Sequence, residues 1–158
     1  MKRGVGKIKR LFFSEVRVLY ADTDAMGVAY HTNYIRWFEI GRTELLREIG
    51  FPYSEFEKYP VWMPLAQAYC EYKQPAHYDD LVEIVSYISE MGHASLILNY
   101  EIRRKPTGEL LVSGYTRHGF TDDKLKPIAL KKVYPELYAA LKAIAADEEF
   151  KGRKGKRA

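Results

Sequence analysis

Two carboxylates separated by one residue, Asp22 and Asp24, are the side chains of this sequence best placed to do chemistry. They lie in the stretch ADTDAMG, whose last residue, Gly27, allows a sharp bend into the segment that follows. In an extended loop these two side chains point to opposite sides, so that one acid can react while the other holds the loop. The amides just past the bend would be unpaired donors at a helix N-terminus, which stabilise an oxygen that gains negative charge. A carboxylate that faces such donors indicates acyl transfer.

Aspartate, threonine and glycine before a helix also have a purely structural explanation. These residue types are common in turns and at the N-terminal caps of helices. The local pattern alone therefore leaves a catalytic loop and an ordinary helix cap both open. The pattern also leaves open which of the two acids would react.

Other motifs for catalysis or ligand binding are absent from the sequence. It contains no GxSxG elbow, no P-loop, no GxGxxG and no HExxH. His77, His93 and His118 do not have the spacing of a metal site. The single cysteine, Cys70, excludes an internal disulfide and a CxxC motif, and we predict that it fills the core. We therefore expect neither a metal nor a cofactor.

The acidic loop leads into a long amphipathic helix, predicted over residues 34–50. Gly50 and Pro52 mark its end. Its apolar side covers about half of the circumference, which is wider than the stripe of an ordinary surface helix. That side comprises Tyr34, Ile35, Trp37, Phe38, Gly41, Leu45, Leu46 and Ile49. Such a helix suits a curved sheet that wraps around it.

Strands are predicted on both sides of this helix. The first covers residues 12–20, with Val16, Val18 and Tyr20 on one face. Three or four long antiparallel strands follow it, and a C-terminal helix is predicted over residues 134–146. The later strands are expected at 61–73, 81–91, 94–104 and 110–121, with turns at Pro75, Gly92 and the PTG of 106–108. Alternation in the third of these predicts a buried face made of Leu96, Leu98, Tyr100 and Ile102.

Length and charge indicate one domain with basic ends. The 158 residues suffice for a single domain, expected over 11–147, between tails at 1–10 and 148–158. Ten of the 25 Lys and Arg residues lie in 1–10 and 151–158, which leaves 15 of them against 21 acidic residues. We expect solvated, disordered tails with no specific nucleic-acid role, because no aromatic residues interleave with the basic ones.

Hydropathy gives no sign of a membrane protein. No apolar run approaches the roughly 20 residues that cross a bilayer, so no transmembrane segment is predicted. The basic start MKRGVGKIKR lacks the apolar stretch of a signal peptide. A cytoplasmic location is the resulting expectation.

The stretch YADTDAMGVAYHTNY, residues 20–34, resembles the signature of the 4-hydroxybenzoyl-CoA thioesterase family of hotdog-fold proteins, in particular its YbgC-like branch of acyl-CoA thioesterases. The similarity continues through Arg36, Trp37, Phe38, Glu39, Arg42, Thr43 and Glu44, and again in YCEYKQPAHYDD, residues 69–80. It spans roughly residues 12–130. The resemblance implies an α+β hotdog fold, in which a curved antiparallel sheet of about five strands wraps a long central helix. In that family two units pair into a homodimer with a continuous sheet, and dimers often assemble into homotetramers.

By this resemblance Asp24 is the catalytic carboxylate, acting either as a nucleophile that forms a mixed anhydride or as a base that activates water. Asp22 is then predicted to be structural, hydrogen-bonding the loop that aims Asp24. His31 lies seven residues later, where the YbgC-like branch also has histidine. Its backbone N–H would polarise the thioester carbonyl, although a histidine that only caps or packs the helix start stays open. Tyr30 and Asn33 would shape the acyl pocket or fix the helix start, and Gly27 would permit the turn.

The activity implied is hydrolysis of short- or medium-chain aliphatic or aromatic acyl-CoA thioesters to free acid and CoA. A thiol of pKa about 8.5 leaves without a strong general acid, so a carboxylate and an oxyanion site can suffice. Two alternatives stay open: a thioesterase for acyl carrier protein, and a non-catalytic acyl-CoA-binding or scaffold module. Candidates for binding the CoA phosphates are Arg103, Arg104 and Lys105, or Lys124, Lys126, Lys131 and Lys132.

Overall fold

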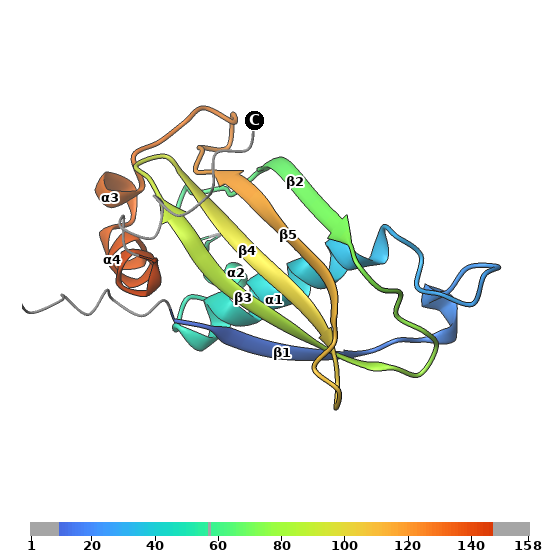
Figure 1. The fold of residues 1–158 in the computed structure, drawn as a ribbon. Helices are drawn as coiled ribbons and strands as arrows, with labels where there is room; N and C mark the ends of the chain where they lie inside the picture. Colours follow the sequence, from blue (N-terminus) through green and yellow to red (C-terminus); the bar gives the residue numbers. More distant parts are fainter. Residues whose placement is uncertain (1–9, 57, 147–158) are drawn as a thin grey trace, which may run out of the picture.

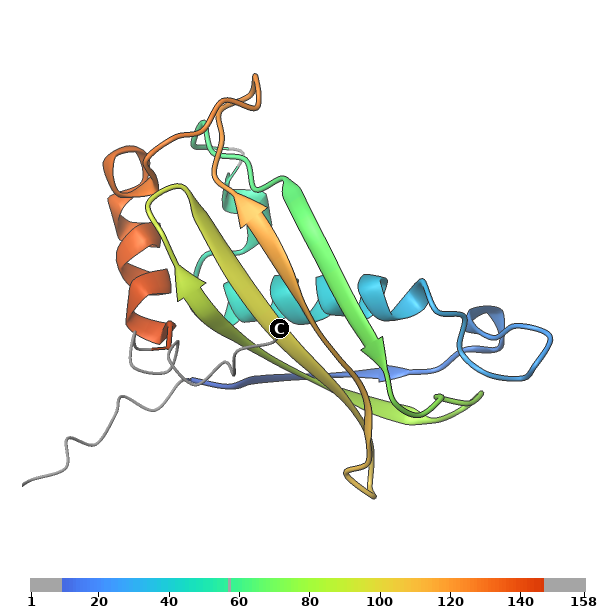
Figure 2. The same cartoon turned by 45° about the horizontal axis from the view of Figure 1, so that its top comes forward.

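An antiparallel sheet of five strands curves around one long helix in this protein (Figures 1 and 2). The computed structural model describes residues 10–56 and 58–146. The strand order across the sheet is β1-β3-β4-β5-β2, so β1 and β2 form the two edges. The strands are β1 (Phe12–Arg17), β2 (Leu65–Tyr72), β3 (Leu81–Met91), β4 (Ser95–Arg104) and β5 (Leu110–Gly119). This is the α+β architecture predicted from the sequence.

The central helix, α1 (Asn33–Glu48), lies against one face of the sheet (Figure 2). The predicted apolar side is confirmed, because six of its eight residues are buried and the remaining two, Ile35 and Ile49, are partly buried against the core. Phe38 stacks on Tyr100 of β4 with ring centroids 4.3 Å apart. The predicted helix boundaries are correct to within two residues.

The predicted bounds of the later strands agree with the structure to within a few residues, and those of β3 agree fully. The first strand is shorter than predicted, because β1 ends at Arg17 and Tyr20–Asp22 form a 3-10 turn, η1. Val18 is fully buried whereas Tyr20 is 79 % exposed, so the expected shared face was wrong for Tyr20. The Asp22 carboxylate accepts the Leu19 N–H at 2.8 Å, and this local bond bends the chain out of the sheet.

The C-terminal region covers the end of the sheet opposite to the acidic loop (Figure 1). The predicted terminal helix is α4 (Pro135–Ile144). Two four-residue helices, α2 (Tyr53–Phe56) and α3 (Leu130–Val133), were not predicted, because so short a segment carries no periodic pattern. Among the described residues, no helix is both long and apolar enough to cross a membrane. The predicted tails lie outside the described residues except for Arg10, which pairs with Glu48 at 3.2 Å.

A buried chain of polar side chains crosses the core beside α1. Arg42 donates to the Tyr100 hydroxyl at 3.3 Å, and Tyr100 and Thr116 share a hydrogen bond of 2.7 Å. The Thr116 hydroxyl lies 2.9 Å from Nε2 of His118, whose Nδ1 lies 3.3 Å from the Met63 carbonyl. A neutral His118 protonated on Nδ1 gives every group in this chain a partner. Burial, followed by the nearby Arg42 charge, lowers the pKa of His118 to about 4.

The buried hydrogen-bonded row that ends at His118 predicts that the protein loses stability in acid. The folded-state pKa of His118 lies below its ordinary value of 6.5, so the unfolded chain binds more protons between these two pH values. Neutral His118 therefore makes its full contribution to the free energy of unfolding above pH 6.5. This contribution, about 3 kcal/mol in total, is lost as the pH falls toward 4. Urea unfolding at pH 7.5, 5.5 and 4.5 measures it. His118→Gln cannot titrate and should show a shallower pH dependence; equal slopes for the two proteins would contradict the prediction.

Candidate active site

The acidic loop is anchored through Asp22, which is 4 % exposed. One carboxylate oxygen accepts the Leu19 N–H, and the other accepts Nη2 of Arg36 on α1 at 2.6 Å. Its backbone carbonyl accepts the Tyr30 N–H and Nδ2 of Asn33, both at 2.8 Å. Since both carboxylate oxygens and the carbonyl are engaged in holding the loop, these contacts support the structural role predicted for Asp22.

Asp24 begins a tight turn and keeps one carboxylate oxygen free. Its N–H donates to the Val28 carbonyl and its carbonyl accepts the Gly27 N–H, both at 2.9 Å. Oδ1 accepts the Met26 N–H at 2.9 Å, whereas Oδ2 has no hydrogen-bond partner in the part of the chain that the structure describes. Gly27 has a φ of 75°, a conformation that glycine adopts without strain. The turn therefore presents a carboxylate that is positioned by one oxygen and available through the other.

Asp24 and His31 line the same cavity, which has a volume of about 290 Å³. The cavity is also bordered by Tyr34 of α1 and by Tyr72 and Lys73 at the end of β2. Tyr34 is buried, and its hydroxyl accepts the Ala76 N–H at 3.1 Å. Burial is the main cause of the raised pKa of Tyr34, so this phenol stays neutral. The two residues predicted to be catalytic are thus brought to one hollow.

The N-terminus of α1 lies at the same cavity. Its N-cap residue, Thr32, makes no capping hydrogen bond through its side chain. Within residues 10–56 and 58–146, no acceptor pairs with the N–H groups of His31 and Thr32. Free N–H groups and the positive end of a 16-residue helix favour negative charge beside them. The arrangement can therefore support an oxygen that becomes negative near Asp24.

The three remaining predicted residues lie around the cavity and not on its wall. The Tyr30 ring contacts the His31 ring, with centroids 4.4 Å apart. Asn33 is tied to the Asp22 carbonyl, which corresponds to fixing the helix start, the second of its two predicted roles. Gly27 forms the turn, and its position is open to solvent. None of Tyr30, Asn33 and Gly27 is among the residues that line the cavity.

Sequence reasoning missed Tyr72, Lys73 and Gln74 as wall residues of this cavity. They belong to the motif YCEYKQPAHYDD, which carried part of the family resemblance but suggested no role for any single residue. The segment reaches the loop through the Ala29 N–H, which donates to the Ala76 carbonyl at 2.8 Å. The signal in the sequence for these wall residues was therefore the presence of this second motif. Its contact with the acidic loop forms only in the folded chain.

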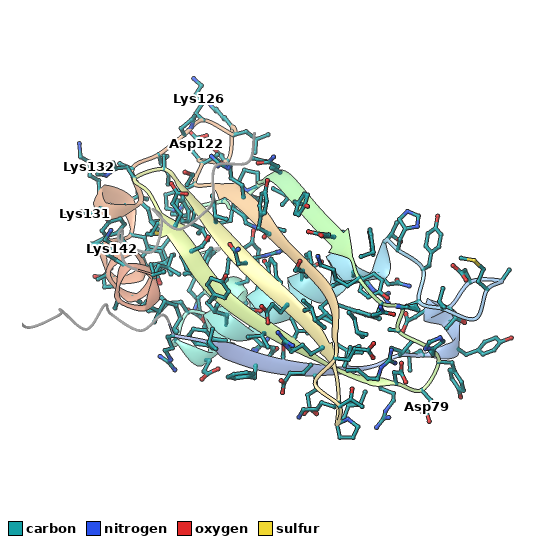
Figure 3. The ribbon with its side chains drawn as sticks, viewed as in Figure 1. Asp79, Asp122, Lys126, Lys131, Lys132 and Lys142 are labelled. Atoms are coloured by element: carbon teal, nitrogen blue, oxygen red, sulfur yellow. The ribbon has the colours of Figure 1, made fainter. Side chains whose placement is uncertain are left out.

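Of the two basic clusters considered for CoA phosphates, the one at residues 103–105 reaches the edge of this cavity, because Nη2 of Arg104 donates to the carbonyl of Pro75, a wall residue, at 2.8 Å. Arg104 is paired with Asp80 and Glu109, and Lys105 is paired with Glu15 and Glu83. The lysines of the other cluster lie at the α3 and α4 end of the sheet, as Figure 3 shows for Lys126, Lys131 and Lys132. Lys73 is the basic side chain among the cavity's wall residues, and it is paired with Glu71. The lysines at the α3 and α4 end therefore lie away from the cavity.

Comparison with known proteins relates the chain to thioesterases. Residues 18–150 match the family described as the Thioesterase-like superfamily. YneP of Bacillus subtilis, which is provisionally assigned as an acyl-CoA thioesterase, is 36 % identical over 127 residues, covering 80 % of this chain and 91 % of YneP. The acyl-CoA thioesterase YbgC of Haemophilus influenzae is 32 % identical over 134 residues, covering 83 % of this chain and 96 % of YbgC. The crystal structure of a DHNA-CoA thioesterase from Staphylococcus aureus superposes with a TM-score of 0.81 at 29 % identity, covering 94 % of this chain and 97 % of that one.

Proposed function

Because this chain belongs to the Thioesterase-like superfamily, we propose that it is a thioester hydrolase that cleaves acyl-CoA to a free acid and CoA. The observation that carries the proposal is the shared cavity of Asp24 and His31 at the uncapped N-terminus of α1. The similarity to acyl-CoA thioesterases over most of the chain supports it. Short- and medium-chain aliphatic and aromatic acyl groups are the substrates proposed.

In the proposed reaction the thioester carbonyl lies between Asp24 and the His31 N–H. The free oxygen of Asp24 either attacks the carbonyl carbon or removes a proton from a water molecule that does so. The carbonyl oxygen becomes negative and is stabilised by the His31 N–H. Among the described residues, no internal acceptor binds this N–H. The C–S bond then breaks and its electron pair leaves with the CoA sulfur, which in the base route takes the proton from Asp24 and so regenerates the carboxylate. In the nucleophilic route, water hydrolyses the acyl-aspartyl anhydride and regenerates the carboxylate.

Thiol release from a panel of thioesters tests this proposal. The panel runs from acetyl-CoA to long-chain acyl-CoA and includes benzoyl-CoA and the same acyl groups on acyl carrier protein. Turnover of at least one CoA ester is expected. Preference for the carrier-protein esters would favour the alternative acyl carrier protein thioesterase. Binding without turnover, measured by calorimetry on the same esters, would indicate a non-catalytic acyl-CoA-binding module.

We also propose that the chain forms a homodimer, assembling further into a homotetramer, through the β2 edge of its sheet. Leu65 and Tyr69 on this strand are 52 % and 40 % exposed, and long apolar edge strands readily pair with another chain. Light scattering should give a mass of twice or four times 18.4 kDa. A Leu65→Lys/Tyr69→Lys variant should lower this mass, because charge on an edge strand opposes pairing.

The control for this experiment is Leu125→Lys, which adds one positive charge at an exposed leucine outside the sheet. It should leave the mass unchanged. A wild-type mass of 18.4 kDa, or an unchanged mass for the β2 variant, would count against the proposed interface. The cytoplasmic location remains a prediction from the sequence.

A further inference from the structure

The His31 carbonyl accepts a hydrogen bond from a residue 41 positions away in the sequence. Tyr72, the last residue of β2, donates its hydroxyl to this oxygen at 3.0 Å. Both residues line the cavity that contains Asp24. The contact therefore ties the edge strand to the backbone at the start of α1, beside the N–H proposed to bind the thioester oxygen.

The segment around His31 is held on both sides of that N–H. On one side the Tyr30 N–H donates to the Asp22 carbonyl at 2.8 Å, and on the other the His31 carbonyl is held by Tyr72. Because peptide units are planar, fixing this carbonyl also fixes the peptide that joins His31 to Thr32. That peptide carries the unpaired Thr32 N–H. The unpaired His31 N–H belongs to the preceding peptide, whose Tyr30 carbonyl accepts the Asn33 N–H at 2.9 Å, so the two unpaired N–H groups lie on adjacent anchored peptides.

The Tyr72 side chain suits this role chemically. Its ring packs edge-on against Tyr34, with centroids 5.5 Å apart, and meets the His31 ring at 6.4 Å. Burial, followed by interactions with Cys70 and Tyr34, raises the pKa of Tyr72 to about 12. The hydroxyl therefore remains a donor in neutral and mildly alkaline solution. The ring contacts position the phenol, and the hydroxyl makes the bond to the loop.

We infer that Tyr72 is a positioning residue of the thioesterase reaction, because its hydroxyl holds the His31 carbonyl and thereby fixes the helix start whose unpaired His31 and Thr32 N–H groups face the oxygen of the thioester. This inference rests on the proposed function. Negative charge on that oxygen develops fully only during the reaction, so a misdirected N–H should slow turnover more than it weakens substrate binding.

Tyr72→Phe tests the inference because it removes the hydroxyl and keeps the ring. We expect kcat to fall about tenfold, as a small misplacement of a catalytic donor would cause, while KM stays within about twofold. The affinity for a non-hydrolysable thioether analogue of the best acyl-CoA substrate should be unchanged. Tyr53→Phe removes a hydroxyl from the exposed α2 tyrosine and should leave kcat unaltered. Thermal unfolding of both variants checks that the fold is retained.

Hydrogen exchange of the peptide covering residues 28–34 reports on the anchor without using activity. Tyr72→Phe should exchange faster than wild type there, and Tyr53→Phe should not. An active wild type with an unchanged kcat in Tyr72→Phe would overturn the positioning role and leave the proposed function intact. A wild type that hydrolyses no thioester would overturn both, whatever the exchange shows. A loss of thioether affinity equal to the loss of kcat would also overturn the inference, because it would indicate general damage to the site.

Discussion

Asp24→Asn is expected to lower kcat for acyl-CoA hydrolysis about a thousandfold, within the range attributed to a positioned acid or base. The substitution keeps the size of the side chain, and its amide oxygen can still accept the Met26 N–H that positions Asp24. It removes the negative charge from the oxygen that is free to attack the thioester or to activate water. The measurement is single-turnover and steady-state thiol release from the best substrate of the panel, made on both proteins.

Asp79→Asn is a matched control for this substitution. Asp79 is an exposed aspartate outside the cavity (Figure 3), and its φ of 67° is one that asparagine tolerates. Its activity should equal that of wild type. If Asp24→Asn remained folded and kept wild-type activity, Asp24 would have no part in the chemistry. Equal losses in both variants would point to an effect of charge in general, with no special role for Asp24.

Gly114→Ala should destabilise the fold by about 3 kcal/mol or more, because the added methyl group has no space. A Cβ at Gly114 would lie 2.2 Å from the Tyr69 carbonyl oxygen and 2.8 Å from the Phe38 ring. Gly114 is on β5 opposite Cys70 of β2, and Phe38 is on α1. The methyl group would therefore separate both the edge strand and the central helix from the sheet. A fall of roughly 10 °C in Tm is expected for a chain of this size.

Gly119→Ala makes the same change at the last residue of β5. A Cβ there meets its nearest atoms at 3.8 and 3.9 Å, which is ordinary contact. Its Tm should remain close to that of wild type in differential scanning calorimetry. A stable Gly114→Ala protein with a wild-type Tm would show that α1 and β2 can move away at little cost, contrary to the close packing described above.

Much of the architecture could be predicted because apolar residues recur at regular intervals along the helices and strands. The period of the apolar residues identified α1 and its buried side, and alternation identified the buried face of β4. Tyr20 was assigned wrongly because alternation assumes a continuing strand, whereas the Asp22 carboxylate bends the chain at Leu19. The helices α2 and α3 were missed because four residues cannot display a helical period.

Part of the candidate site could likewise be predicted from the sequence, and part was decided by the tertiary structure. Residue types and spacing alone indicated the acid pair Asp22 and Asp24, the turn at Gly27 and the helix start that follows, because these features are contiguous in the chain. Family resemblance selected Asp24 as the catalytic acid and added His31. The meeting of this segment with Tyr72 was decided by the tertiary structure, since strand register and sheet curvature bring together groups 41 residues apart. The tertiary structure also decided that the lysines of α3 lie at the far end of the sheet, because where a charged side chain finally lies depends on how the elements pack. Local chemistry could therefore be read from the sequence, whereas the walls and anchors of the cavity depend on contacts that form only when distant segments pack together.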